Sequence, residues 1–217
     1  MERESKIWES IPSEIDMTIK ADDPRLFFPQ CTSLTPVETI HENPWFVVRN
    51  RGGYFTTEYR HYQVIILPIV ADHSIVMVRV RRPVIDDTVL ELPAGNAKEG
   101  ESPLQTAVRE FYEETGIKID DIRRFRALPP VCSSPNRNPK LLHVYQVCIS
   151  ENEFVSRQPH DKEIIDVMKM SFKEATEMIS RGQIYVSIPM AVIGRYLFER
   201  MRRSLKGAYE IPEFGAL

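Results

Sequence analysis

The sequence predicts an α+β fold in which strands come first, one helix is inserted among them, and two helices end the chain. Two β-branched runs, residues 62–71 and 74–81, are separated by Asp72-His73 and predict a central hairpin. Residues 102–116 carry start and stop signals of a helix, and residues 171–205 carry two more such patterns. We therefore expect a sheet with helices packed against it.

The remaining strands are predicted from shorter patterns. Residues 1–43 are polar and interrupted by four prolines, which indicates an irregular arm. Residues 45–49 and 54–59 flank the turn residues Asn50 to Gly53 and predict an N-terminal hairpin. Residues 89–92 lead as a strand into Pro93-Ala94-Gly95, and further strands are expected at 122–128 and 141–149.

The inserted helix is bounded by residue types that favour helix ends. Ser102 suits the N-cap, Pro103 the first helical position, and Gln105 completes a capping box, while Gly116 can end the helix. The predicted helix is 103–115. A second capping box at 171–174 opens a helix that stops at Gly182, and residues 188 or 189 to about 205 form the last helix.

The inserted helix carries an unusual concentration of carboxylates. One stripe is apolar and is expected to pack, whereas Glu110, Glu113 and Glu114 form an adjacent stripe that is expected to face outward. Like charges at these spacings destabilise a helix in water, and a divalent cation reverses that effect. The stripe is therefore either an ordinary solvated acidic face or a site for a hard cation such as Mg²⁺.

The spacing around this helix favours the cation site. Its positions are Gly95, Glu101, Arg109-Glu110, Glu113-Glu114 and Gly116, followed by an apolar residue. This pattern resembles the box of the Nudix hydrolases, and the resemblance covers roughly residues 62–205. It implies an α/β/α sandwich with a mixed sheet plus an N-terminal β-hairpin extension. The expected organisation is an arm and hairpin at 1–61, a Nudix domain at 62–205 and a tail at 206–217.

The resemblance also implies roles for individual residues. Nudix enzymes use Mg²⁺ or Mn²⁺ to hydrolyse a nucleoside diphosphate linked to another moiety. Glu110 and Glu114 match the principal metal ligands, and Glu113 matches a further ligand or a nearby acid. The backbone carbonyl of Ala94 reaches the metal in relatives, Glu101 supports the loop or a metal through water, and Arg109 orients the carboxylates.

Within that family the chain is similar to the ADP-ribose pyrophosphatase group. The resemblance rests on the block VMVRVRRP…LELPAGNAKEGE, on the two C-terminal helices and on the N-terminal hairpin, which in that group forms a dimer and closes over the partner's substrate. Arg82 is a candidate contact for phosphate or ribose, because a guanidinium matches phosphate geometry; alternatively it is a surface arginine that flanks a strand. Glu91 and Trp45 are further candidates for substrate binding. Trp45 in a hairpin is alternatively a packing or interface residue.

A general base is expected in the segment before the C-terminal helices. Residues 160–163, His-Asp-Lys-Glu, offer two carboxylates just ahead of Ile164-Ile165. We favour Glu163 over Asp161, because a carboxylate next to a metal-bound water is a plausible base. The alternative is a hydrophilic loop with ordinary charges.

Composition limits the classes of partner. A formal net charge of −3 without a basic stripe argues against nucleic acids and anionic membranes. The chain has no long apolar run, and Cys31, Cys132 and Cys148 match no zinc or redox motif, so we expect reduced thiols in a cytoplasmic protein.

Three functions stay open: a nucleoside diphosphate sugar pyrophosphatase, a Nudix hydrolase of another nucleotide, and a non-catalytic nucleotide sensor.

Overall fold

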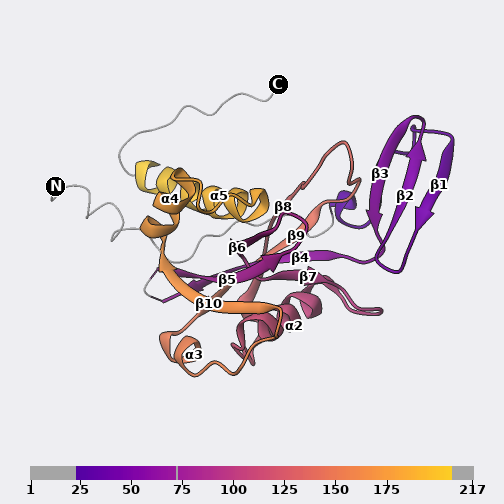
Figure 1. Ribbon diagram of the computed structural model, residues 1–217. Coiled ribbons are helices and arrows are strands. Elements are labelled where there is room, and N and C mark those ends of the chain that lie inside the picture. Colours follow the sequence, from indigo (N-terminus) through magenta and orange to yellow (C-terminus); the bar gives the residue numbers. More distant parts are fainter. Residues whose placement is uncertain (1–22, 72, 207–217) are drawn as a thin grey trace.

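The computed structural model describes residues 23–71 and 73–206, without the side chains of 203–206, and contains two sheets (Figure 1). The predicted segments 1–22 and 207–217, and Asp72 of the central turn, lie outside the described residues. The three-stranded sheet consists of β1 (Val37–Glu42), β2 (Phe46–Arg51) and β3 (Tyr54–Tyr59). The seven-stranded sheet consists of β4 (Gln63–Val70), β5 (Ser74–Arg82), β6 (Asp87–Glu91), β7 (Ala94–Asn96), β8 (Phe125–Val131), β9 (Leu142–Ile149) and β10 (Ile164–Ser171). The helices are α2 (Pro103–Thr115), α3 (Glu151–Val155), α4 (Phe172–Ser180) and α5 (Ser187–Lys206), with short 3₁₀ turns η1 (Pro24–Leu26) and η2 (Ile122–Arg124).

The large sheet is mixed, because β4 runs parallel to β9 while its other strand pairs are antiparallel. Its order is β10-β5-β4-β9-β8. The predicted central hairpin of β4 and β5 is present, but the two strands pair only at Ile69 and Ile75. Beyond that point β6 pairs with β5 and β7 pairs with β4. The segment 87–96 is thereby joined to both strands of the hairpin.

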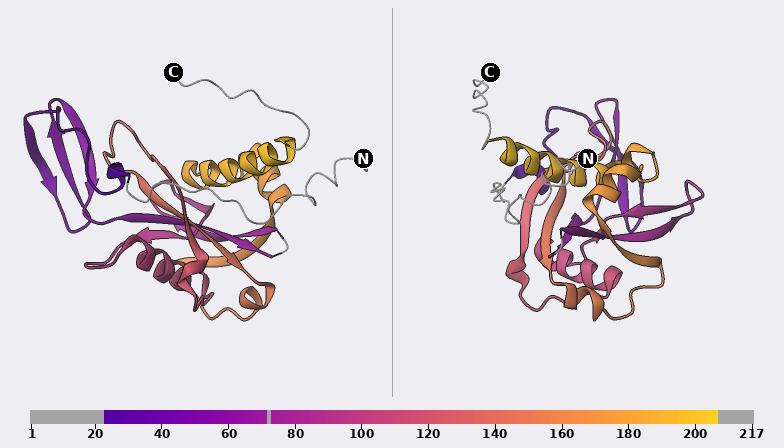
Figure 2. Two further views of the ribbon diagram at one scale, coloured as in Figure 1. Left: turned by 180° about the vertical axis from the view of Figure 1, so that it is seen from behind. Right: turned by 90° about the vertical axis from the view of Figure 1, so that its left-hand side faces the viewer.

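The layers form an α/β/α sandwich, as the sequence predicted. Helix α2 covers one face of the large sheet, and α4 and α5 cover the other (Figures 1 and 2). Strand β4 shows why: its side chains alternate between the faces, with Val64 and Ile66 in the α2 core and Ile65 and Leu67 in the α4–α5 core. Both faces of this strand are buried, which explains its nearly continuous apolar sequence.

Helix α2 begins and ends as predicted. The Ser102 hydroxyl accepts from the Gln105 amide and the Gln105 side chain accepts from the Ser102 amide, which is the predicted capping box. Gly116 follows the helix with φ of 70°, and its N–H donates to the carbonyl of Tyr112. The capping box at Ser171 and Glu174 is likewise present at the start of α4.

Several elements were not predicted, and one predicted strand boundary was wrong. Strand β1 lies within the segment predicted to be irregular; all six of its residues are exposed, so no alternation of apolar residues marks it. Strand β10 was not predicted either, because a bulge between Ile164 and Asp166 interrupts its alternation and leaves Ile165 exposed. The strand predicted at 122–128 begins later, since η2 occupies its first turn. The short helix α3 was also missed.

The predicted N-terminal hairpin is β2 and β3, and β1 adds a third strand to it. This small sheet stands at one end of the molecule, away from α4 and α5 (Figures 1 and 2). Its cross-strand register places Val47 opposite Glu58 and Arg49 opposite Thr56 on one face.

Within the described residues, no helix is long and apolar enough to cross a membrane.

Candidate active site

The candidate site forms where α2 meets the inserted strand β7. The backbone N–H of Ala94 donates to Glu114 Oε2 over 2.9 Å. A Cβ placed on Gly95 would lie 2.1 Å from the carboxyl carbon of Glu110, so the Glu110 side chain occupies the space that a larger residue would need. Gly95 is therefore required by a close approach of two elements.

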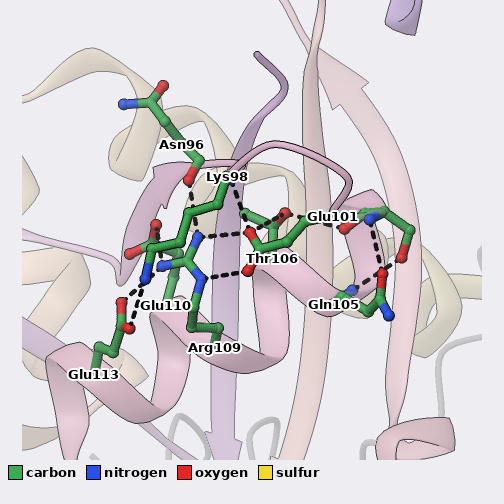
Figure 3. A network of polar contacts seen from close by, with 9 residues as sticks. Asn96, Lys98, Glu101, Gln105, Thr106, Arg109, Glu110 and Glu113 are labelled. Carbon is green, nitrogen blue, oxygen red and sulfur yellow. Dashed lines mark hydrogen bonds and ion pairs between the residues drawn. The ribbon is translucent and has the colours of Figure 1, made fainter.

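Arg109 ties the first part of the motif together (Figure 3). Its guanidinium donates to both oxygens of Glu101, at 2.7 and 2.8 Å, and to Glu113 Oε2 at 2.7 Å. It also lies 2.9 Å from Glu110 Oε1 and donates to the carbonyl of Asn96. The hydrogen bonds from Arg109 hold the pKa of Glu101 near 2, against its burial. Arg109 thus orients the carboxylates of the loop and of the helix.

Glu110 and Glu114 are in a different electrostatic environment. Burial raises the pKa of Glu114 to about 8, and the neighbouring Glu110 and Glu91 add to this effect while the Ala94 N–H opposes it. Burial also raises the pKa of Glu110, although Arg109 opposes the shift. The prediction of an outward-facing acidic stripe was therefore wrong for Glu110 and Glu114, whose side chains lie against β7, whereas 32% of the Glu113 side chain is exposed.

The donor set fits a hard divalent cation. Two adjacent, largely buried carboxylates have raised pKa values, because the charge of Arg109 near Glu110 and that of Arg82 near Glu114 do not offset their burial. Among the described residues, no group of three or more His, Cys, Asp or Glu side chains could hold a metal ion alone. Glu101 and Glu113 are held by Arg109. A pair of carboxylates that leaves positions for water and phosphate oxygens is the arrangement that Mg²⁺ commonly uses in proteins.

Arg82 and Glu91 lie on the same side of the sheet as α2. Arg82 Nε and Nη2 donate to the two oxygens of Glu91 at 2.8 and 2.9 Å. The hydrogen bonds that Arg82 donates to Glu91 raise the pKa of Arg82, and the charges of Glu91, Glu114 and Glu163 contribute. The structure therefore brings Arg82 and Glu91 to the carboxylate pair, with Glu163 within electrostatic range.

The segment that carries Asp161 and Glu163 is fastened to the end of α2. The Gln158 N–H donates to the carbonyl of Gly116, and the Asp161 N–H donates to that of Glu113. Both acidic side chains of this segment are exposed. Trp45 precedes β2 in the N-terminal sheet, and 71% of it is exposed.

Three contributors were missed by the sequence analysis. Lys98 Nζ lies 3.2 Å from Glu113 Oε1, the buried Thr106 hydroxyl donates to Glu101, and the Asn96 carbonyl accepts from Arg109. Asn96 and Lys98 lie between Gly95 and Glu101, where the motif allows any residue, so the pattern carried no signal for them. Thr106 was detectable in principle, because it lies one turn before Arg109 and Glu110.

Comparison with known proteins agrees with this geometry. Residues 59–186, more than half of the chain, match the NUDIX domain, so the chain belongs to the Nudix family. It is similar to the ADP-ribose pyrophosphatase of Bacillus subtilis (strain 168), at 27% identity over 125 residues, covering 56% of this chain and 64% of the relative. It is also similar to the methanol dehydrogenase activator of Bacillus methanolicus, at 30% identity over 125 residues, covering 57% and 65%. The ADP-sugar pyrophosphatase of Mus musculus is 34% identical over 88 residues, covering 41% and 39%. The chain therefore spans less than two thirds of the length of these relatives.

Proposed function

We propose that this protein is a divalent-metal-dependent pyrophosphohydrolase. Its substrate is ADP-ribose or a related nucleoside diphosphate sugar, and its products are a nucleoside monophosphate and a sugar phosphate. The observation that carries the proposal is the largely buried pair Glu110 and Glu114, which lies against Gly95 and Ala94 within the Nudix motif and near Arg82. The names of two similar proteins, an ADP-ribose and an ADP-sugar pyrophosphatase, support the substrate class.

Glu110, Glu114 and the carbonyl of Ala94 would hold Mg²⁺ or Mn²⁺, and Glu113 and Glu101 would support them through Arg109. When bound, the cation neutralises diphosphate charge and lowers the pKa of a bound water. Arg109 keeps the carboxylates oriented before substrate arrives, which lowers the reorganisation needed in the reaction. Without Arg109, the carboxylates of this network would repel one another.

Arg82 is the proposed phosphate contact. Its guanidinium is half-exposed and is held in place by both oxygens of Glu91, so it can present its remaining N–H groups to a diphosphate oxygen. Glu91 would therefore act on substrate binding by positioning Arg82. Trp45 would contribute to base stacking only if the N-terminal sheet of a second copy reached the site.

Glu163 is the proposed general base, and Asp161 is the alternative. The two backbone hydrogen bonds from residues 158 and 161 to the end of α2 keep this segment next to the carboxylate helix. The charge of Glu163 contributes to the raised pKa of Arg82, which supports Glu163 over Asp161. A proton from the attacking water would be taken up at its carboxylate oxygen.

The test is product analysis. The purified protein is incubated with Mg²⁺ and a panel of ADP-ribose, other nucleoside diphosphate sugars, dinucleoside polyphosphates, nucleoside triphosphates and nucleotide cofactors, and the products are identified by mass. AMP and ribose 5-phosphate from ADP-ribose support the proposal. If another nucleotide of the panel is cleaved and ADP-ribose is not, that nucleotide is the substrate. Tight binding of a nucleotide without turnover indicates a non-catalytic nucleotide sensor. Glu114→Gln is the matched control, since it keeps the size of a proposed ligand and removes its charge.

We further propose that the protein is a cytoplasmic homodimer that does not bind nucleic acid or membranes, with an N-terminal unit at 1–61, a Nudix domain at 62–205 and a tail at 206–217. Exposed apolar side chains on and next to the N-terminal sheet, including Val37, Ile40 and Phe55, support an interface there. Light scattering tests the dimer: a monomeric mass at micromolar protein concentrations would contradict it.

A further inference from the structure

A cavity lies on one face of the N-terminal sheet, outside the candidate active site. Its volume is about 380 Å³, and its walls come from β2, β3, Pro29, Arg60 and Lys140. Its cationic residues are Arg49, Arg51, Arg60 and Lys140, and Glu58 is the one carboxylate among its lining residues. Neither the Nudix motif nor the proposed reaction accounts for this concentration of positive charge.

Both carboxylate oxygens of Glu58 already accept hydrogen bonds from neighbouring side chains. Only 5% of the residue is exposed, and Arg51 donates to both of its carboxylate oxygens through Nε and Nη2, at 2.7 and 3.1 Å. Arg49 Nη1 and the Thr56 hydroxyl also donate to it. One carboxylate therefore shares its charge between two guanidinium groups, and the cluster keeps an excess of positive charge.

Lys140 makes no direct contact with Glu58, although the charge of Glu58 acts on it. Its ammonium is half-buried and donates to the backbone carbonyl of Tyr59 at 2.9 Å. Within the described residues, no carboxylate lies within ion-pair distance of it. Arg60 differs, because it pairs with the exposed Glu42 and with the Asn43 carbonyl. Burying an ammonium without an anion is unfavourable, so a bound anion would stabilise this arrangement.

We propose that this cavity is a binding site for the phosphate group of a small anionic ligand, separate from the carboxylate site on α2. A phosphate monoester carries close to two negative charges near neutral pH, which matches the excess of cations better than a single carboxylate does. Arg49 engages Glu58 through one nitrogen only, so its remaining N–H donors can bind phosphate oxygens while Lys140 supplies a point charge.

The test is calorimetric titration of the full chain with inorganic phosphate and, separately, with ribose 5-phosphate. EDTA and a buffer of low ionic strength, free of phosphate and sulfate, keep divalent metals out of the α2 site. We expect binding of at least one probe, weakened about tenfold or more in Lys140→Gln and in Arg49→Gln and largely retained in Lys140→Arg. Equal affinities mean that phosphate alone is recognised, whereas tighter binding of the sugar phosphate identifies an organic phosphate.

Arg82→Gln is the control that separates the two sites, because it removes a cation next to the α2 carboxylates. Loss of phosphate binding in Arg82→Gln, with Lys140→Gln binding as wild type, would assign the anion to the α2 site and overturn the inference. No binding by the wild-type chain up to tens of millimolar probe would overturn it as well. Thermal unfolding of every variant checks folding, and Arg60→Gln replaces any cavity variant that fails to fold.

Discussion

Gly95→Ala should impair the reaction while leaving the fold intact. The added Cβ would lie 2.1, 2.2 and 2.4 Å from the three carboxyl atoms of Glu110, whereas ordinary contact begins at 3.4 Å. The Glu110 carboxylate must therefore retreat by about 1 Å or more. It can do so by rotating, because it is the free end of a flexible side chain, so the cost in folding free energy should stay below about 1 kcal/mol. The position of a proposed metal ligand, however, would change.

Misplacement by about 1 Å is sufficient to reduce catalysis about 10²-fold. We therefore expect Gly95→Ala to lower kcat for ADP-ribose by about that factor and to weaken Mn²⁺ binding, measured by calorimetry without substrate. The metal titration separates the geometric argument from the choice of substrate. Wild-type turnover together with wild-type metal affinity in this variant would refute the assignment of Glu110.

Gly116→Ala is the matched contrast, because it makes the same change at the other glycine of the motif. There φ is +70°, and the new Cβ would lie 1.8 Å from the backbone carbonyl oxygen of Gln158. Backbone atoms cannot rotate away, so the segment that carries Glu163 must shift and an alanine must adopt a left-handed conformation. We expect a loss of at least about 2 kcal/mol of unfolding free energy. Equal stability of the two variants in urea denaturation would contradict this distinction.

Three further predictions concern single side chains. Glu163→Gln should lower kcat about 10²-fold or more with metal affinity retained, whereas Asp161→Asn should act as wild type; the reverse result would make Asp161 the base. Arg109→Gln should cost roughly 2 kcal/mol of stability in urea denaturation, because it leaves the carboxylates of Glu101 and Glu113 without their shared partner; a wild-type midpoint would contradict this. Burial lowers the pKa of His143 from 6.5 to about 4, so the unfolded chain binds more protons between these values. Stability should therefore fall by up to about 3 kcal/mol as the pH drops from 6.5 to 4, and His143→Gln should flatten that dependence; an unchanged slope in the variant would assign it to other groups.

The parts of the site that the sequence predicted correctly depend on local signals. Ser102, Pro103 and Gly116 act within one turn of the helix ends, so α2 could be placed to the residue. The burial of Glu114 could not be predicted, because it depends on β7, which lies twenty residues earlier in the chain and reaches α2 only through the sheet. Helical periodicity shows which residues share a face, but it does not show what covers that face.

Two edge strands show that sequence periodicity also fails where side chains are not buried. β1 and β10 lie at the edges of their sheets. An edge strand can pair its backbone on one side without burying an alternating set of side chains, so its residues need not follow the pattern that identifies a central strand. β4, which is buried on both faces, was correctly predicted for the opposite reason.

The separation of β4 and β5 links the fold to the chemistry of the site. Because these strands pair only at Ile69 and Ile75, the segment 87–96 can pair with both of them. Val78 then lies opposite Glu91, which puts Glu91 on the α2 face beside Arg82, while Leu90 enters the core under α4 and α5. A shift of one residue in this register would exchange the two faces, burying Glu91 among apolar side chains and removing the partner of Arg82. The turn at residues 83–86 connects β5 and β6 in this register. The position of Arg82, the proposed phosphate contact, therefore depends on this turn, which lies outside the Nudix motif.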